Sequence, residues 1–168
     1  MVSQAVPVVV DAASGEDLWF GGGLVTFKIT SAQSGGEYAV IHDRMLRGKT
    51  TPLHVHPSFD ETIFVIEGEL LVHVDGAEHV AGAGAIASIP RGVPHALLVT
   101  SEEARIIVFV TPGDVFERFF REGGDAPTGR DATPPPLDIE KVRVAGERTG
   151  AMEVLGAPPF ARDVLAPQ

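Results

Sequence analysis

Short runs of apolar residues recur along residues 18–111 and are separated by turns rich in glycine. Many short strands with glycine between them are typical of an all-β sandwich or barrel. The sequence contains no internal repeat, which indicates one barrel and not two. The predicted strands are Leu18–Phe20, Leu24–Thr30, Tyr38–Leu46, Thr62–Ile66, Leu70–Val74, Ala85–Ile89, Ala96–Thr100 and Ala104–Thr111.

Two of the glycine turns predict hairpins. Asp75-Gly76 is the stronger signal, because both residues tolerate the positive φ angles of a two-residue turn. The segment Glu67-Gly68-Glu69 joins two apolar runs and predicts a second hairpin, again because glycine reaches positive φ without strain.

Beyond residue 112 the spacing of apolar residues becomes helical. Asp114 is predicted to cap a helix that carries Glu117 at its third position, and Gly123 with its glycine neighbour supplies the stop. The apolar side of this helix either packs on the barrel or covers a pocket, and the two roles are compatible. That side is formed by Val115, Phe116, Phe119 and Phe120.

These patterns divide the chain into three parts. Residues 1–16 form an N-terminal arm, and residues 17–122 form the β-barrel with its flanking helix. Residues 123–168 comprise a linker rich in glycine and proline, a short helix from Asp138 to Thr149, and an extended tail that wraps the barrel or hangs free. Ile139 and Val142 are expected to face inward from the short helix.

Composition narrows the possible functions. The 168 residues carry 13 Lys and Arg against 23 Asp and Glu, a net charge of −10, which argues against a nucleic-acid partner. No apolar run approaches the roughly 20 residues of a membrane span, so no membrane partner is expected. The first residues do not resemble a secretory signal, and the expected location is cytoplasmic. The chain has no cysteine, which excludes thiolate ligands and a cysteine nucleophile.

Two histidines one residue apart point to metal chemistry. Residues i and i+2 of a strand face the same side, so the imidazoles of His54 and His56 can converge on one ion. On a helix they would diverge by about 200°. Pro52 and Pro57 disfavour a helix there, so the segment that carries both histidines is predicted to be a strand.

The residues around this pair resemble the two signature motifs of the cupin superfamily. The first motif reads Gly48-x5-His54-x-His56-x4-Glu61-x6-Gly68, and the second reads Gly84-x5-Pro90-x-Gly92-x2-His95. The usual last asparagine of the second motif is replaced by Val99, at a position that is not a metal ligand in the family. The resemblance implies an all-β fold: a single antiparallel cupin barrel (a double-stranded β-helix or jelly roll) with short C-terminal helices. It also implies one metal ion held by His54, His56, Glu61 and His95.

Nitrogen and oxygen ligands suit one divalent transition metal ion, with iron, manganese, nickel, copper, cobalt and zinc all open. Three neutral imidazoles and one carboxylate leave two positions of an octahedral ion for water, dioxygen or substrate. A carboxylate ligand can also dissociate and accept a proton, so Glu61 is the predicted catalytic residue. The neighbouring Asp60 is expected to point elsewhere.

Alternation along the strands predicts the pocket. Ile63 and Val65 should face the same way as Glu61, and Leu97 and Val99 the same way as His95. All four are apolar, which suits an aromatic substrate, although an apolar barrel interior would by itself give the same pattern.

Segments outside the motifs are similar to bacterial single-barrel proteins grouped with quercetin 2,3-dioxygenases. They are Leu18-Trp19-Phe20, Thr111-Pro112-Gly113 with the helix after it, and residues 152–159. The likeness implies a metal-dependent dioxygenase acting on a phenolic or enolisable, flavonol-like small molecule, with dioxygen as second substrate and a homodimer as the expected assembly. Two alternatives stay open: a redox-neutral isomerase, cyclase or lyase that uses the ion as a Lewis acid, and a non-catalytic small-molecule-binding cupin.

Overall fold

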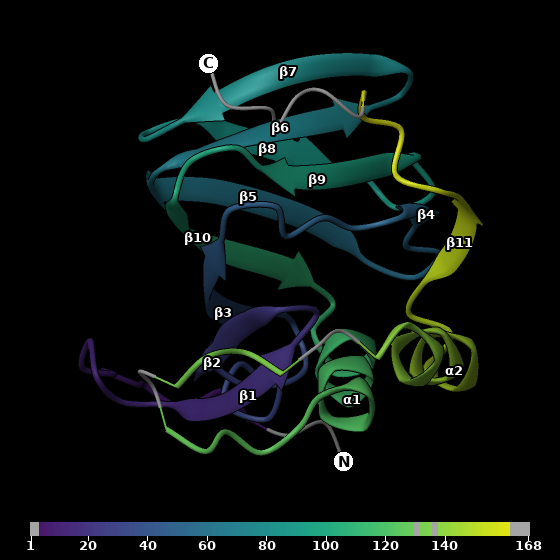
Figure 1. The fold of residues 1–168 in the computed structure, drawn as a ribbon. Helices are drawn as coiled ribbons and strands as arrows, with labels where there is room; N and C mark the ends of the chain where they lie inside the picture. The colour runs from purple at the N-terminus through teal and green to yellow at the C-terminus, as the bar shows by residue number, and fades with distance from the viewer. Residues whose placement is uncertain (1–3, 130–131, 136–137, 162–168) are drawn as a thin grey trace.

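The structure, a computed structural model, describes residues 4–129, 132–135 and 138–161. It confirms the all-β fold with short C-terminal helices: two antiparallel sheets form the barrel, and the helices α1 and α2 lie side by side at the lower right of Figure 1. One sheet has the order β1 (Glu16–Phe20), β2 (Gly23–Ile29), β3 (Ala39–Leu46), β10 (Glu103–Thr111), β5 (Asp60–Glu67) and β8 (Ile86–Ile89). The other has the order β11 (Glu153–Gly156), β4 (Leu53–Val55), β9 (His95–Val99), β6 (Glu69–Val74) and β7 (Ala77–Gly82).

The core lies between the two sheets and follows from strand alternation. On β10, the inward positions are all buried and apolar, while the positions between them are partly or fully exposed. Burying Ile106, Val108 or Val110 contributes roughly 1.5–3 kcal/mol each, and burying the smaller Ala104 contributes less. Phe59 and Phe116 are the largest of the fully buried side chains, and they meet edge to face with ring centroids 5.6 Å apart. The fold therefore surrounds the site with an apolar interior.

Every predicted strand has a counterpart in the structure, but two further strands, β7 and β11, were not predicted. Their residues are mostly exposed and carry no alternating apolar pattern. Both lie at an edge of the five-stranded sheet, where β7 pairs with β6 and β11 pairs with β4. These strands are defined by the pairing of their backbones with neighbouring strands, and the pattern of apolar residues does not reveal that pairing.

One predicted hairpin is confirmed and the other is wrong. β6 and β7 pair with Val74 opposite Ala77, so Asp75-Gly76 forms the two-residue turn, with φ angles of 47° and 81°. In contrast, β5 and β6 belong to different sheets, so Gly68 lies where the chain crosses between sheets. Its φ of 81° is positive, and a Cβ there would collide with the carbonyl oxygen of Glu103. A glycine turn specifies local geometry but not which strands then pair.

The first helix, α1 (Asp114–Gly123), begins one residue earlier than predicted. Gly113 is its N-cap, and no side-chain cap hydrogen bond is found among the described residues, so the predicted Asp114 cap is wrong. Glu117 is buried and accepts hydrogen bonds from the backbone N–H of Ser31 and, at 2.8 Å, from Arg121. Its carboxylate thus ties the helix to the loop after β2.

The second helix, α2 (Ile139–Thr149), has the predicted bounds. The Asp138 side chain accepts a hydrogen bond from the backbone N–H of Lys141 at 2.9 Å, and Gly150 ends the helix in the left-handed conformation. Val142 packs against the core, but Ile139 is 71% exposed, so its predicted inward position is wrong.

The predicted extended tail lies partly outside the described residues, which end at 161. Within the described part, β11 uses residues that had been assigned to this tail. Across the described ranges, no helix combines the length and apolar character that a membrane crossing requires.

Candidate metal centre

The three histidines come from the five-stranded sheet and the residue that follows its strand β4, and the six-stranded sheet adds a glutamate. His54 on β4 and His95 at the start of β9 are register partners, so their rings lie across the strand pair from one another. His56 is the first residue after β4, and Glu61 lies on β5 of the opposite sheet. The structure therefore brings together the four side chains that the two motifs supply.

Each imidazole is oriented by a backbone carbonyl oxygen. The Nδ1 atoms of His54 and His95 lie 2.8 Å and 2.9 Å from the carbonyl oxygens of Pro52 and Val93. The Nδ1 atom of His56 lies 2.8 Å from the carbonyl oxygen of Ala151, far along the chain. A carbonyl oxygen can only accept, so Nδ1 carries the proton in each ring and Nε2 presents its lone pair. Metal-binding histidines are oriented in this way.

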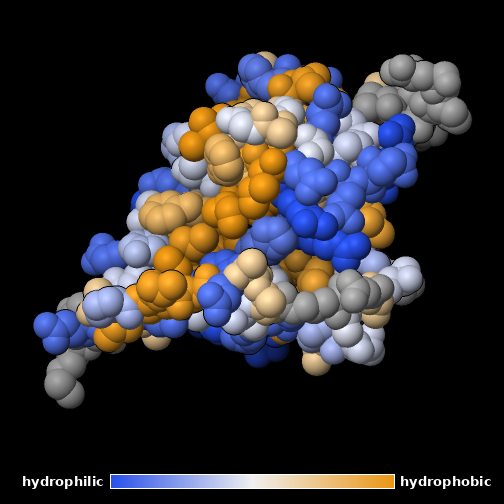
Figure 2. Space-filling view, turned by 90° about the vertical axis from the view of Figure 1, so that its left-hand side faces the viewer, coloured by the Kyte–Doolittle hydropathy of each residue, from blue (hydrophilic) through white to orange (hydrophobic). Residues whose placement is uncertain are grey.

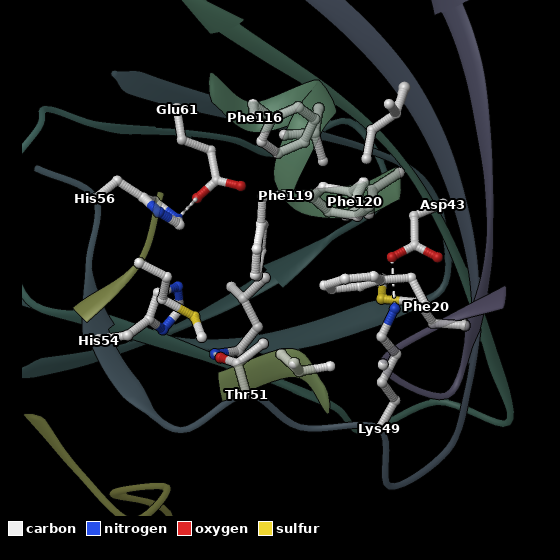
Figure 3. Close-up of a pocket in the computed structure, with 18 of the residues that line it drawn as sticks. Phe20, Asp43, Lys49, Thr51, His54, His56, Glu61, Phe116, Phe119 and Phe120 are labelled. Atoms are coloured by element: carbon white, nitrogen blue, oxygen red, sulfur yellow. Dashed lines mark hydrogen bonds and ion pairs between the residues drawn. The ribbon is translucent and has the colours of Figure 1, made fainter. Parts of the chain in front are cut away.

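The ring nitrogens converge. One nitrogen from each of His54, His56 and His95 lies within 4.8 Å of the other two, and all three residues are buried. Oε2 of Glu61 lies 3.2 Å from Nε2 of His95 and 3.6 Å from Nε2 of His56, as the left side of Figure 3 shows for His56. Nε2 of His95 is buried and has no hydrogen-bond partner with acceptable geometry among the described residues. A buried lone pair in this position fits a metal ion.

The protonation states suit a cation. Burial, followed by the nearby His95 and His56, lowers the pKa of His54 to about 3. Burial alone would raise the pKa of Glu61, but the imidazoles of His56 and His95 outweigh it and hold that pKa below its usual range. Burial also acts to lower the pKa of His95, and the Glu61 carboxylate outweighs it and raises that pKa. At neutral pH the site thus holds an ionised carboxylate and a neutral His54, the forms that metal binding requires.

An apolar cavity opens beside the cluster. Leu97 and Val99 line it, as expected, whereas Ile63 and Val65 are buried in the surrounding core and are not among the described lining residues. Three phenylalanines of α1 also line it and pack against the barrel, so the helix has both of the roles considered for it. They are Phe116, Phe119 and Phe120.

Asp60 points away from the cluster, as expected. Its carboxylate accepts hydrogen bonds from the Arg91 guanidinium at 2.9 Å and 3.0 Å and from the Arg91 backbone N–H at 2.8 Å. The two adjacent residues of β5 therefore have different roles. Glu61 faces the cluster, and Asp60 binds Arg91 in the loop that precedes His95.

The sequence did not reveal two charged residues of the cavity wall, Asp43 and Lys49. A signal for Asp43 was present, because strict alternation along β3 places it inward between Ile41 and Met45. Lys49 had no such signal, since it lies in the loop after the strand. The part played by the Ala151 carbonyl was likewise invisible, because it depends on how the C-terminal segment packs.

Comparisons with known proteins agree with this fold and site. Residues 42–114 match the family model described as a cupin domain. Quercetin 2,3-dioxygenase of Bacillus subtilis is 28% identical over 112 residues, which are 67% of this chain and 33% of that protein. Oxalate oxidase 1 of Hordeum vulgare is 33% identical over 120 residues, which are 64% of this chain and 56% of that protein. The chain thus spans less than two thirds of the length of either relative.

Among solved structures, the cupin-superfamily sugar phosphate isomerase of Silicibacter pomeroyi superposes on this chain with a TM-score of 0.54. The two chains are 24% identical, and the match covers 62% of this chain and 75% of that one. At that identity the likeness concerns the fold. The motif spacing, the two-sheet barrel, the histidine cluster and the matching domain model lead to one conclusion: residues 42–114 of this chain are a cupin domain.

Proposed function

We propose that this protein is a metal-dependent dioxygenase that acts on a phenolic or enolisable, flavonol-like small molecule. The observation that carries the proposal is the set of three oriented imidazoles beside the buried carboxylate of Glu61, at one side of an apolar cavity. The similarity to quercetin 2,3-dioxygenase supports the choice of reaction and substrate class.

In this proposal, a divalent transition metal ion is held by Nε2 of His54, His56 and His95 and by the carboxylate of Glu61. Nitrogen and oxygen ligands of this kind suit several first-row ions. When bound, such an ion supplies Lewis acidity and, if it is redox-active, a means of engaging dioxygen.

Glu61 is the proposed general base. Its carboxylate is ionised at neutral pH and buried beside two imidazoles, so it is able to accept the hydroxyl proton of an enolisable substrate at Oε2. The neighbouring wall excludes water, because Leu97, Val99 and Phe119 present apolar groups. A metal ion held by the three histidines and Glu61 would favour the enolate form of the substrate by offsetting the negative charge that deprotonation leaves.

The test combines metal analysis with oxygen measurement. The purified protein, loaded in turn with iron, manganese, nickel and copper, is incubated with a panel of flavonols in an oxygen-electrode cell. Oxygen consumption that matches substrate loss is the expected result. Turnover that continues unchanged under nitrogen would replace the proposal with a redox-neutral reaction. Failure to bind any metal, or to turn over any panel member, would leave a small-molecule-binding protein.

We also propose that the outer face of the six-stranded sheet binds a second copy of the chain. Figure 2 shows apolar residues gathered in a band beside a polar region. Phe64, Ile86 and Phe109 lie on the adjacent strands β5, β8 and β10 and are 42%, 69% and 37% exposed. Exposed apolar side chains on neighbouring strands are typical of a protein–protein interface, and a self-complementary contact would give a two-fold dimer.

A further inference from the structure

The chain crosses from one sheet to the other beside the proposed metal centre. β8 ends in the six-stranded sheet, where Ile89 is the register partner of Glu61 on β5. β9 begins in the five-stranded sheet at His95. The segment between them, residues 90–94, therefore links the strand that pairs with Glu61 to the strand that carries His95.

A tight turn forms most of this link. The Val93 N–H donates to the carbonyl oxygen of Pro90 at 3.2 Å, and Gly92 has a φ of 78°. A positive φ at the third of four residues is typical of a type II turn, and glycine adopts it without strain. The Pro90-x-Gly92 part of the second motif thus specifies the shape of this turn.

The backbone of the turn holds two of the three histidines. The Gly92 N–H donates to the carbonyl oxygen of His56 at 2.9 Å, which fixes the backbone of that residue. The Val93 carbonyl oxygen lies 2.9 Å from Nδ1 of His95 and orients that ring. A displacement of the turn would therefore move His56 and His95 together.

Asp60 ties the same turn to β5. Its Oδ1 accepts hydrogen bonds from the Arg91 backbone N–H at 2.8 Å and from Nε of Arg91 at 3.0 Å, and its Oδ2 accepts one from Nη2 at 2.9 Å. The two bonds from the guanidinium form a fork that matches the geometry of a carboxylate. Asp60 directly precedes Glu61, so the turn is held by the neighbour of the carboxylate that faces the histidines.

Global stability does not account for this arrangement. The side chains of Asp60 and Arg91 are 42% and 50% exposed, and an ion pair in such surroundings stabilises a fold only slightly. The pair does fix the position of the turn relative to β5. Oε2 of Glu61 lies 3.2 Å from Nε2 of His95 and 3.6 Å from Nε2 of His56, and these distances depend on how closely the two sheets approach at the turn.

We propose that Asp60 is a positioning residue of the metal centre and acts through Arg91 and the turn after β8. The pair holds His56 and His95 at a fixed distance from Glu61, and neither member supplies a ligand atom. The inference rests on the proposed function in that the four side chains bind a metal ion, and it does not depend on which reaction the ion supports.

Cobalt(II) is the probe for this role, because its visible d–d absorption depends on the geometry of its ligands. Competition with a chelator gives the affinity of each purified protein for the ion, and the absorption spectrum reports on the geometry of the site. Urea unfolding of the same proteins without metal gives their stability. The three measurements separate a change at the metal centre from a change in the fold as a whole.

Asp60→Ala removes all three hydrogen bonds. It should bind cobalt about tenfold more weakly and shift the d–d spectrum, as the loss of groups that orient metal ligands does. Asp60→Asn keeps an oxygen that can accept from the Arg91 N–H, so it should recover much of the affinity and of the spectrum. Arg91→Ala removes the fork but keeps the backbone N–H, and its affinity should lie between those of Asp60→Ala and the wild type.

Glu16→Ala is the matched control. Glu16 is an exposed carboxylate that accepts a similar fork from Arg121, at 3.2 Å from Nε and 2.9 Å from Nη2. It lies on β1, which three strands separate from β5 in the same sheet. This variant should keep the cobalt affinity and the spectrum of the wild type, and Asp60→Ala should be about as stable as this variant when both are free of metal.

The outcomes separate the positioning role from the proposed function. Wild-type affinity and spectrum in Asp60→Ala, or in Arg91→Ala should Asp60→Ala fail to fold, overturn the positioning role alone. A loss of affinity that is matched by an equal loss in the free energy of unfolding also overturns it, because the pair would then support only the fold. A wild-type protein that binds no cobalt overturns both proposals. The expected affinities and spectra, in a protein that consumes no oxygen with any flavonol, support the positioning role and overturn only the dioxygenase.

Discussion

His56 and Ala151 are 95 residues apart in the chain, yet Nδ1 of His56 donates to the carbonyl oxygen of Ala151 at 2.8 Å. Ala151 is completely buried at the point where the chain leaves α2 and enters β11. The next strand, β11, pairs with β4, which carries His54. The C-terminal segment therefore supports two members of the histidine cluster without contributing a side chain to it.

A truncated chain that ends at Gly150 is expected to bind a divalent metal ion at least about tenfold more weakly, because His56 loses the acceptor that sets its tautomer and orientation. Competition with a chromophoric chelator measures the affinity. A chain that ends at Ala161 retains Ala151 and β11 and is the matched control. Equal affinities in the two truncated proteins would contradict the role given to Ala151.

Replacing a histidine of the cluster should remove the metal. His54→Ala, His56→Ala and His95→Ala are each expected to reduce bound metal to well below one ion per chain after dialysis, because each deletes one converging nitrogen. His79→Ala is the control, since His79 is exposed on β7. Elemental analysis gives the stoichiometry, and full metal content in the cluster variants would exclude the proposed ligand set.

Glu61→Gln should separate chemistry from metal binding. The amide keeps the size of the side chain but cannot accept a proton, so turnover of an accepted flavonol is expected to fall about 100-fold or more. Metal content should fall less than in the histidine variants. Glu67→Gln, an exposed change on the same strand, should leave kcat unaltered. A Glu61→Gln protein with normal kcat would rule out the general-base role.

Acid should weaken the contact between β1 and α1. The Arg121 side chain donates hydrogen bonds to Glu16 and holds the pKa of that carboxyl below its ordinary value. Because the folded-state pKa is depressed, the contribution is complete above the unfolded value and is lost as pH falls through the folded one. Glu16 is partly exposed, so after solvent screening the contribution is below about 1 kcal/mol.

The corresponding measurement compares urea unfolding of the wild type and Glu16→Gln between about pH 7 and pH 3. The wild type should be the more stable protein near neutral pH, and the difference should vanish at the acid end. A difference that grows as the pH falls would have the wrong sign for this ion pair.

Phe64→Glu should weaken self-association. A charge at this exposed position of β5 would be buried without a partner in the proposed dimer, whereas it stays hydrated in the monomer. Sedimentation equilibrium is expected to show a dimer for the wild type and a monomer for the variant. Val9→Glu, a change at a more exposed position in the N-terminal arm, should leave the dimer intact. A monomeric wild type would contradict the proposed interface.

Much of the fold and of the candidate site could be predicted because the relevant signals are local. Alternation along β3 and β10 identifies strands and their inward faces, and Asp75-Gly76 has the backbone freedom of a two-residue turn. The spacing of His54 and His56 places two imidazoles on one side of an extended segment. These features depend on residues a few positions apart, whose geometry the backbone dictates.

Other features depended on packing between distant segments. Gly68 looked like a hairpin turn but lies at a crossover between sheets, because strand pairing is decided by burial of the whole sheet and not by the turn. Ile63 and Val65 alternate correctly with Glu61, yet the surrounding core covers them before they reach the cavity.

The sequence by itself determined a single β-barrel with a motif of three histidines and one glutamate, because strand periodicity and turn chemistry act over short stretches of chain. Only the tertiary structure decided which carbonyl oxygens orient those histidines and how Asp43 and Lys49 meet beside Gly23. The physical reason is that hydrogen bonds and burial join residues by their distance in space, which the order of residues along the chain does not record.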